Sequence, residues 1–541
     1  MIEVPSLNSD SSRASDEVQI VASTPRLTHQ LLIRGSRAHA ESAKLPTIHV
    51  ATYAVGHTFN DMAAAVWFSY LLLYLQYAVG LSGAQAGGVM FAGQLADALA
   101  TPLVGLASDA GRGCCFLGRR KSWNLVGVAV VAVNFSLMFL CTLFPGWPAL
   151  PSAAKAAALG VFAALFNVGW AAVQVSHMSL VPELTRDEGE RVYLNSARYA
   201  LTVLSNVAVF LVMLVLLPGS SVAGPSDQAE YKQPRVFQML ALVVLCVGLL
   251  CSAVFLGCGK EPTPEELAAR EAASSSAAAE PAAGSVEDSD STPLLQGGAA
   301  AAPERRSSGE EEAFYPVAAW RDWLRVPDFW RVMGVYTLVR LSVNISQVYL
   351  TFLVTETLAM SQQAVAITPL LLYLAQLLST ALSRRIAVRL GRKRSIFAGS
   401  ALTMAACTSM LLVQPGASAP VVYGSVLLLG AGLALSMVVS VSLEADLVGN
   451  RLSSAAFVYG ACSFADKLSS GVFVLAVQTM RDLSFPLGAP HHETFIRLVN
   501  AVVPAASALL AALLASTLQF PAAPARAKGR EEGGKAATGS Q

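Results

Sequence analysis

Long apolar stretches recur along this 541-residue chain and constrain its fold more than any other feature. A helix needs about 20 apolar residues to cross the hydrocarbon core of a bilayer. Only 13% of the chain is charged, about half the share in a typical soluble domain. The sequence therefore predicts an all-α membrane protein with twelve spans, near 49–77, 83–108, 123–144, 156–181, 192–217, 236–258, 332–357, 363–383, 395–414, 420–445, 455–480 and 498–518.

The basic residues indicate how these spans are oriented. When the N-terminus is placed in the cytosol, most of the 37 lysines and arginines fall in cytosolic segments. Because Lys and Arg resist translocation, this bias predicts that both termini are cytosolic. The same charges are divided among short loops, which argues against a nucleic acid as a partner. The polar start of the chain is expected to be a tail and not a signal peptide.

A polar linker divides the spans into two sets of six. It is rich in Ala, Ser, Glu and Pro, a composition typical of disorder. The predicted parts are a disordered cytosolic tail, a six-helix half, the disordered linker, a second six-helix half and a cytosolic C-terminal tail, over 1–46, 47–258, 259–328, 329–520 and 521–541.

The linker contains a short sorting pattern. Asp290 is followed by three spacers and then by Leu294 and Leu295. Sorting adaptors read such acidic-dileucine patterns in disordered cytosolic segments, where this one is placed. Clathrin-adaptor complexes are therefore expected partners.

The two halves also resemble each other. LGRRKSW at 117–123 corresponds to LGRKRSI at 390–396, and SLVPEL at 179–184 corresponds to SLEADL at 442–447. Each half has these features in the same order. Two parallel six-helix repeats are the layout of major facilitator transporters.

Ionisable residues inside the spans are the candidates for function. Such a residue costs at least ~2.5–3.5 kcal/mol in the bilayer interior and usually faces a partner or a water-filled path. His57 and Asp61 are four residues apart and share a helix face. Asp97 is suited either to carry a proton or to pair with a buried base. The other candidates are His177, Arg198, Arg340, Asp466 and Lys467.

Two further observations concern neighbouring charges and the outer ends of the spans. Asp466 and Lys467 are adjacent, so they point about 100° apart on a helix and need not pair. Glu356, near an outer end, is expected to be solvated. His491 and His492 are expected to lie in a solvated outer loop.

No enzyme or metal motif is complete. HHETF at 491–495 lacks the last histidine of HExxH, because Ile496 stands in its place. The eight cysteines have no CxxC spacing. The chain is therefore predicted to be no enzyme and to need neither a metal nor a cofactor.

Several stretches resemble the melibiose-type sugar:cation symporters of the major facilitator superfamily. They include YAVGHTFND at 53–61, LADALATPLVG at 95–105, SARYA at 196–200 and SFADKLSSG at 463–471. The resemblance implies the major facilitator fold, with 12 transmembrane helices in two pseudo-symmetric six-helix halves. We also expect the protein to be a monomer.

The resemblance assigns roles to several residues. The family's sugar-binding acid in span one, arginine in span five and lysine in span eleven fall on Asp61, Arg198 and Lys467. Of the two cation-site aspartates, Asp97 matches the first. The second is Thr101 here, and the acid of span four is Gln174, which argues against sodium-coupled sugar transport. The predicted solute-binding residues are Asp61, Gln174, Arg198, Arg340 and Lys467, and the predicted proton-coupling residues are His57, Asp97 and Thr101.

One loop resembles the superfamily's cytosolic gate. The pattern G-x-x-x-D…G-R-[KR] is carried here by Gly105, Asp109, Gly118, Arg119 and Arg120. In the second half, Leu382 occupies the position equivalent to Asp109, so a symmetric gate is not expected.

Other stretches are VWFSYLLLYL at 66–75, SHMSLVPEL at 176–184, RLSVNISQVYL at 340–350 and STPLL at 291–295. With these, the chain more closely resembles lysosomal and melanosomal cysteine transporters of this superfamily. The resemblance implies import of cysteine from the cytosol into these organelles. Two other hypotheses stay open. One is a sugar:cation symporter, and the other is a non-transporting membrane scaffold or sensor that binds partners through its linker.

Overall fold

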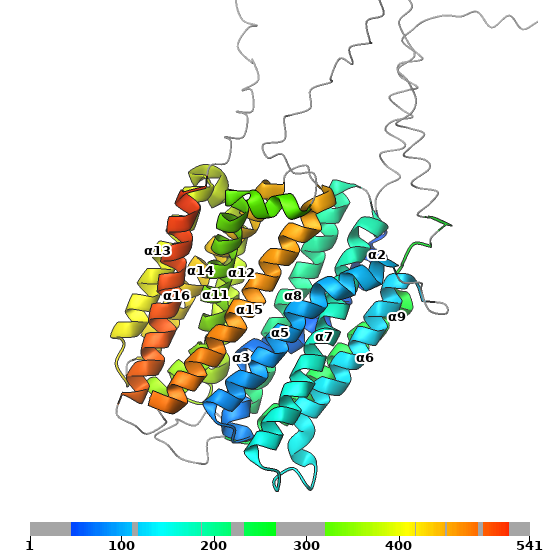
Figure 1. Ribbon diagram of the computed structural model, residues 1–541. Helices are drawn as coiled ribbons and strands as arrows, with labels where there is room; N and C mark the ends of the chain where they lie inside the picture. The colour runs from blue at the N-terminus through cyan, green and yellow to red at the C-terminus, as the bar shows by residue number, and fades with distance from the viewer. Residues whose placement is uncertain are drawn as a thin grey trace, which may run out of the picture. The chain divides into compact units, whose positions relative to one another are not determined.

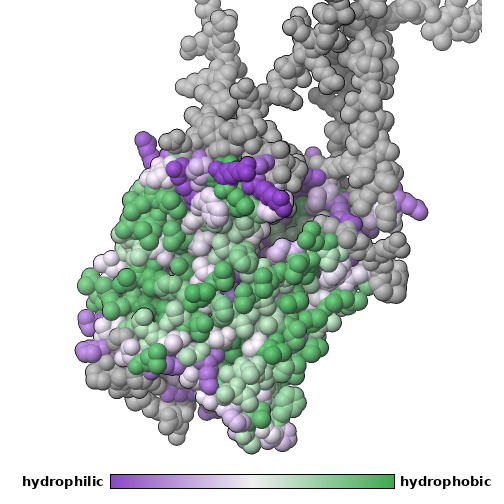
Figure 2. Space-filling view, viewed as in Figure 1, coloured by the Kyte–Doolittle hydropathy of each residue, from purple (hydrophilic) through white to green (hydrophobic). Residues whose placement is uncertain are grey.

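A bundle of long helices makes up the part of the chain that the computed structural model describes. Among the described residues, eleven helices are long and apolar enough to cross a membrane, and they match every one of the twelve predicted spans except the first. Figure 1 shows these helices side by side. On the face seen in Figure 2, apolar side chains cover the middle, and polar ones gather at the upper edge and, fewer of them, at the lower edge. The described residues are 45–110, 117–185, 187–217, 232–263, 265–266, 320–416, 418–448, 452–484 and 491–518.

Each half consists of several long helices and a few short helical segments. The first half contains α2 (Thr47–Val55), α3 (Thr58–Ser69), α4 (Leu71–Leu73), the π-helix η1 (Tyr74–Ala78), α5 (Gly83–Ala110), α6 (Arg119–Leu140), the 3-10 helix η2 (Cys141–Leu143), α7 (Ser152–Leu184), α8 (Glu188–Leu216) and α9 (Pro234–Cys258). The second half contains η4 (Trp320–Arg325), α11 (Pro327–Phe352), the π-helix η5 (Leu353–Thr357), α12 (Ala364–Leu390), α13 (Arg392–Leu412), α14 (Ala419–Val448), α15 (Leu452–Ser484) and α16 (His492–Ser516).

The first predicted span is not one helix but a series of pieces. α2 ends at Val55, and a turn at Gly56 and His57 precedes α3. A Cβ added to Gly56 would come within 2.5 Å of the Phe255 ring on α9 and 3.0 Å of His177 on α7. Only glycine therefore permits this close packing. The break places His57 at the N-cap position of α3.

Matched glycines give both halves the same close helix contact. α6 packs on α7 through Gly127 and Gly169, and α13 packs on α14 through Gly399 and Gly432. In each pair, an added Cβ would lie within 3.0 Å of the partner's backbone oxygen. Small residues at such positions let membrane helices approach closely. The repeated contact agrees with the repeat predicted from sequence.

The two basic heptapeptides also make equivalent contacts. The Arg119 Nη2 atom lies 3.1 Å from Glu183 Oε1, which belongs to the SLVPEL segment. In the second half, Arg392 pairs with Asp446, which belongs to the SLEADL segment. These arginines therefore do more than mark one side of the membrane, because each pairs with the end of the fourth span in its own half.

Three pairs of helices make the most extensive contacts between the halves. α5 packs on α15, α8 on α12 and α3 on α11. α5 and α15 lie next to each other in the middle of Figure 1. The largest hydrophobic cluster contains residues of both halves, including Trp67 and Tyr349. A cavity with several polar lining residues lies along this junction.

Candidate functional site

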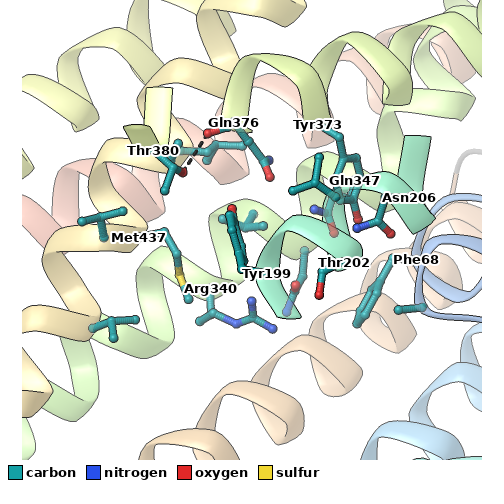
Figure 3. Close-up of a pocket in the computed structure, with 18 of the residues that line it drawn as sticks. Phe68, Tyr199, Thr202, Asn206, Arg340, Gln347, Tyr373, Gln376, Thr380 and Met437 are labelled. Carbon is teal, nitrogen blue, oxygen red and sulfur yellow. Dashed lines mark hydrogen bonds between the residues drawn. The ribbon is translucent and has the colours of Figure 1, made fainter. Parts of the chain in front are cut away.

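A cavity of about 530 Å³ lies between the halves. Helices α3 and α8 line it from the first half, and α11, α12 and α14 line it from the second. Figure 3 shows labelled side chains from both halves around this space. The lining residues that carry polar groups are Asp61, Tyr199, Thr202, Asn206, Arg340, Asn344, Gln347, Tyr373, Gln376, Thr380 and Ser442.

The cavity reaches from the middle of the bundle toward one end. We call this end the linker face, because α9 finishes there at Cys258 and α11 starts there at Pro327. Deep in the cavity, Asp61 and Asn344 are buried, whereas Tyr199 and Val441, nearer the linker face, are 41% and 43% exposed. The cavity is therefore wetter toward the linker face.

Asp61 is the anionic group in the cavity wall. One carboxylate oxygen, Oδ1, lies 3.0 Å from His57 Nδ1, as expected for residues one turn apart. The other oxygen, Oδ2, accepts a hydrogen bond of 2.8 Å from the Thr202 hydroxyl on α8. α3 and α8 together fix the position of this charge.

Arg198 is a cation without a counter-ion in the described part of the chain. It lies on α8 one turn before Thr202, whose hydroxyl bonds to its backbone oxygen. The Arg198 Nε atom is buried and has no hydrogen-bond partner among the described residues. Arg198 is not among the residues that line the cavity. An unpaired guanidinium on α8, the helix that also holds Asp61 through Thr202, is nevertheless suited to hold a carboxylate.

Arg340, by contrast, has its charge balanced within the second half. Its Nε atom lies 2.8 Å from Asp466 Oδ2. Asn344 donates to the other Asp466 oxygen, at 3.0 Å, and to Ser470. The cavity thus has a paired cation on α11 facing the anion on α3.

Lys467 points across the junction and not into the cavity. Its Nζ atom lies 2.7 Å from Asp97 Oδ1 and donates to the Thr101 hydroxyl at 2.9 Å. Neither Lys467 nor Asp97 lines the cavity. Asp466 and Lys467 therefore have different partners, as their positions on the helix predict. The pair joins α15 to α5 and leaves Lys467 no free charge for a solute in this conformation.

The remaining predicted residues lie away from the cavity. Gln174 accepts a hydrogen bond from Trp170 Nε1 within α7. Arg120 bonds to Glu183 and Ser108 within its own half. The side chain of Asp109 is outside the described part of the chain, as are Asp290, Leu294 and Leu295.

Gly118 has a packing role that the gate resemblance does not suggest. A Cβ added to it would come within 2.2 Å of the Glu261 carboxylate. Glu261 accepts from the backbone N–H groups of Arg120 and Lys121 at 2.7 and 2.8 Å. A carboxylate at a helix N-terminus is favourable, so the start of the linker caps α6.

The sequence-based expectation for Glu356 is wrong. Its carboxylate is 5% exposed and lies 2.8 Å from Arg481 Nη2 and 2.9 Å from His492 Nε2. Tyr77 of the first half also donates to it. α15 continues to Ser484 and α16 starts at His492, beyond the apolar runs that marked the spans. His492 is therefore part of a helix and buried, whereas His491 is exposed as expected.

A second contact lies at the same end of the bundle. Asp482 accepts from the backbone N–H groups of Gly83 and Ala84, at 2.9 and 2.6 Å. It thereby satisfies the first amides of α5, which have no partner within the helix. We call the set Tyr77, Glu356, Arg481, Asp482 and His492 the opposite-face network. It joins the halves at the end away from the linker face.

Comparison with known proteins identifies the family. The family model described as MFS/sugar transport protein matches residues 51–280 and 299–521. The chain belongs to the major facilitator superfamily. Its fold agrees with that of solved transporters of low sequence identity. These include the inward-open xylose transporter XylE from E. coli, with TM-score 0.57 and 13% identity over 89% of this chain and 97% of that one.

Another solved relative is a bacterial homolog of the human lysosomal transporter Spinster. Its TM-score is 0.58, with 12% identity over 87% of this chain and 96% of that one. At this identity the likeness supports the major facilitator fold alone.

Curated relatives are closer in sequence. Major facilitator superfamily domain-containing protein 12 from Homo sapiens is 35% identical over 79% of this chain and 84% of that protein. The protein of the same name from Mus musculus is 35% identical over 87% of this chain and 93% of its own length. A Synechocystis protein described as an uncharacterized symporter is 28% identical over 41% of this major facilitator chain and 40% of its own.

Proposed function

We propose that this protein is a secondary active transporter that moves cysteine, or a related small solute, from the cytosol into lysosomes and melanosomes. The observation that carries the proposal is the cavity between the halves, with Asp61 in its wall. The unpaired Arg198 does not line the cavity, but it lies one helical turn from Thr202, which holds Asp61. An amino acid has one ammonium and one carboxylate group. Asp61 is suited to the first and Arg198 to the second.

Orientation and location complete the proposal. The linker face carries the basic heptapeptides, so it is assigned to the cytosol, with both termini. The opposite-face network then lies on the lumenal side. The Asp290, Leu294 and Leu295 pattern would direct the monomer to lysosomes and melanosomes through clathrin adaptors. We also propose that the chain is divided as the sequence predicts, into two cytosolic tails, two six-helix halves and the linker between them.

Asp97 is proposed to carry a coupling proton. Its carboxylate pairs with Lys467. The Thr101 hydroxyl donates to Asp97 and accepts from Lys467, so all three side chains lie in the contact between α5 and α15. A proton on Asp97 would cancel its attraction for Lys467 and loosen this contact. Protonation would thereby favour the movement of one half against the other that alternating access requires.

Uptake of labelled cysteine into isolated organelles that carry the protein tests the solute. We expect the wild type to take up cysteine. Asp61→Asn and Arg198→Gln should each reduce the rate of uptake at least about tenfold, because each removes a charge-assisted contact worth about 1.5–3 kcal/mol. A labelled disaccharide serves as the comparison. The match to the sugar transport family model favours a sugar:cation symporter as the second candidate. Uptake of the disaccharide without uptake of cysteine would show that the sugar:cation symporter is the correct candidate.

Replacing residues 267–319 with a Gly/Ser stretch of equal length separates transport from scaffolding. This variant keeps Glu261, which caps α6. Because it loses the dileucine pattern, we expect it to reach the cell surface and to take up cysteine there at a rate within about twofold of the wild type per surface copy. Surface biotinylation gives the number of copies. Full surface delivery without uptake would favour a scaffold or sensor.

A further inference from the structure

Two buried histidines lie beside Asp61 at the break in the first span. His57 is 6% exposed and His177 is fully buried, with their ring centroids 5.4 Å apart. Each ring has one nitrogen with a hydrogen-bond partner. The other nitrogen of each, Nε2 of His57 and Nδ1 of His177, is buried without a partner among the described residues. Two unsatisfied buried nitrogens in one place require an explanation.

The hydrogen bond of His177 fixes its tautomer. Its Nε2 atom lies 2.8 Å from the backbone oxygen of Tyr53, and the Tyr53 ring stacks on the imidazole at 4.2 Å. A carbonyl oxygen only accepts, so Nε2 must carry the hydrogen. In a neutral imidazole the other nitrogen is then an acceptor. His177 therefore presents an unused acceptor, Nδ1, inside the protein.

His57 can use that acceptor when it binds a proton. Its Nδ1 atom is already held by Asp61 Oδ1 at 3.0 Å. A proton added to Nε2 creates a second donor, which needs a partner in this buried place. The centroid separation from His177 is one that a nitrogen-to-nitrogen hydrogen bond between two imidazoles spans. Protonated His57 would then be bonded on both sides, by Asp61 and by His177.

The surrounding helices contribute few other charges. The group nearest to His57 on its own segment, besides Asp61, is Tyr53. α8 contributes Arg198, which acts electrostatically on Tyr53 and His177. α9 contributes the Phe255 ring, whose centroid lies 5.2 Å from that of His177, and the thiol of Cys251. From α11, Arg340 faces the same cavity as Asp61, but it is paired with Asp466.

We propose that His57 and His177 form a proton-binding site that competes with the ammonium group of the solute for Asp61. The charge of Asp61 is balanced either by protonated His57 or by the ammonium group of the solute, and Oδ2 remains with Thr202. Proton and amino-bearing solute then exclude each other at one carboxylate. This inference rests on the proposed function, because it takes the solute to be an amino acid.

The consequence is an exchange of solute for proton. An imidazole is the side chain whose charge changes most readily between about pH 5 and pH 8. While His57 carries no added proton, the charge of Asp61 is available to the ammonium group of the solute. In an acidic lumen His57 would gain a proton and displace the solute from Asp61. The site would then face the cytosol again and release the proton there. Acidity would thus drive the solute into the organelle.

Binding of labelled cysteine to the purified full-length protein at pH 7.0 and pH 5.5 tests this inference. One competing proton changes affinity by at most about tenfold per pH unit, so we expect the Kd of the wild type to rise about tenfold at pH 5.5. In His57→Asn, the amide can still donate to Asp61 but cannot take up a proton. Its Kd should change less than about twofold between the two pH values.

His491→Asn is the matched control. His491 is exposed and has φ +74°, a backbone conformation that asparagine tolerates. It should keep the full pH dependence of the wild type. Wild-type affinity that is equal at both pH values would overturn the inference, as would a pH dependence that survives His57→Asn.

A readout without solute separates this inference from the choice of cysteine. Infrared difference spectra between pH 7.0 and pH 5.5 report protonation of imidazoles in the empty protein. His57→Asn should remove one imidazolium signal, and His177→Gln should shift that signal to lower pH because it removes the Nδ1 acceptor. Identical spectra for the wild type and His57→Asn would rule out the proton site even if cysteine does not bind.

Discussion

Replacing Lys467 with methionine is expected to lower the free energy of unfolding by about 3–5 kcal/mol. The change leaves the Asp97 carboxylate buried without its ion partner, which is the costly way to break a buried pair. The two side chains are 13% and 8% exposed and lie 2.7 Å apart, so water compensates little for the loss. The melting temperature of the purified protein measures the effect.

The double variant Asp97→Leu/Lys467→Met provides the control. Replacing both members of a buried ion pair with apolar residues is often neutral or stabilising. We therefore expect the double variant to recover most of the stability that Lys467→Met loses, and yet to show no pH-driven accumulation of solute. Accumulation that survives in the double variant would remove Asp97 from the coupling mechanism. A stable single variant would contradict the buried ion pair.

Arg481→Gln is expected to open the end of the bundle away from the linker face. The Glu356 carboxylate then loses its ion partner, and breaking such a buried pair costs about 3–5 kcal/mol in the closed arrangement. The population of the open arrangement should rise at least about tenfold, since 1.4 kcal/mol corresponds to a factor of ten. Hydrogen–deuterium exchange of residues 74–90 and 353–366 measures this rise.

Arg235→Gln is the matched control for that experiment. Arg235 is exposed at the start of α9, so its loss should leave exchange unchanged. Peptides from α13 serve as an internal standard, because this helix takes no part in the opposite-face network. Unchanged exchange in Arg481→Gln would mean that the network does not hold the halves together.

The sequence predicts the fold well because bilayer insertion depends on local composition. Eleven spans and the repeat of basic loop and acidic segment can be read from runs of residues. The break in the first span is missed, because nothing local shows that Phe255 and His177 press against Gly56. Its apolar run is continuous although its helix is not.

The site is predicted less completely because pairing depends on distant residues. The sequence identifies Asp61 and Arg340, which line the cavity, and it identifies Asp97 and Lys467 separately. That these two pair with each other depends on the packing of α5 against α15, which no spacing encodes. Glu356 was misjudged for the same reason, since its partner Arg481 lies far along the chain.

The broken first span has a consequence for biosynthesis. The translocon accepts a segment into the bilayer according to its hydrophobicity and its ability to satisfy its own backbone. α2 and α3 are short, are separated by a turn, and carry His57 and Asp61 at depth. Their partners Thr202 and Phe255 are synthesised more than a hundred residues later. We therefore expect the first segment to complete its packing only after α8 and α9 have emerged from the ribosome.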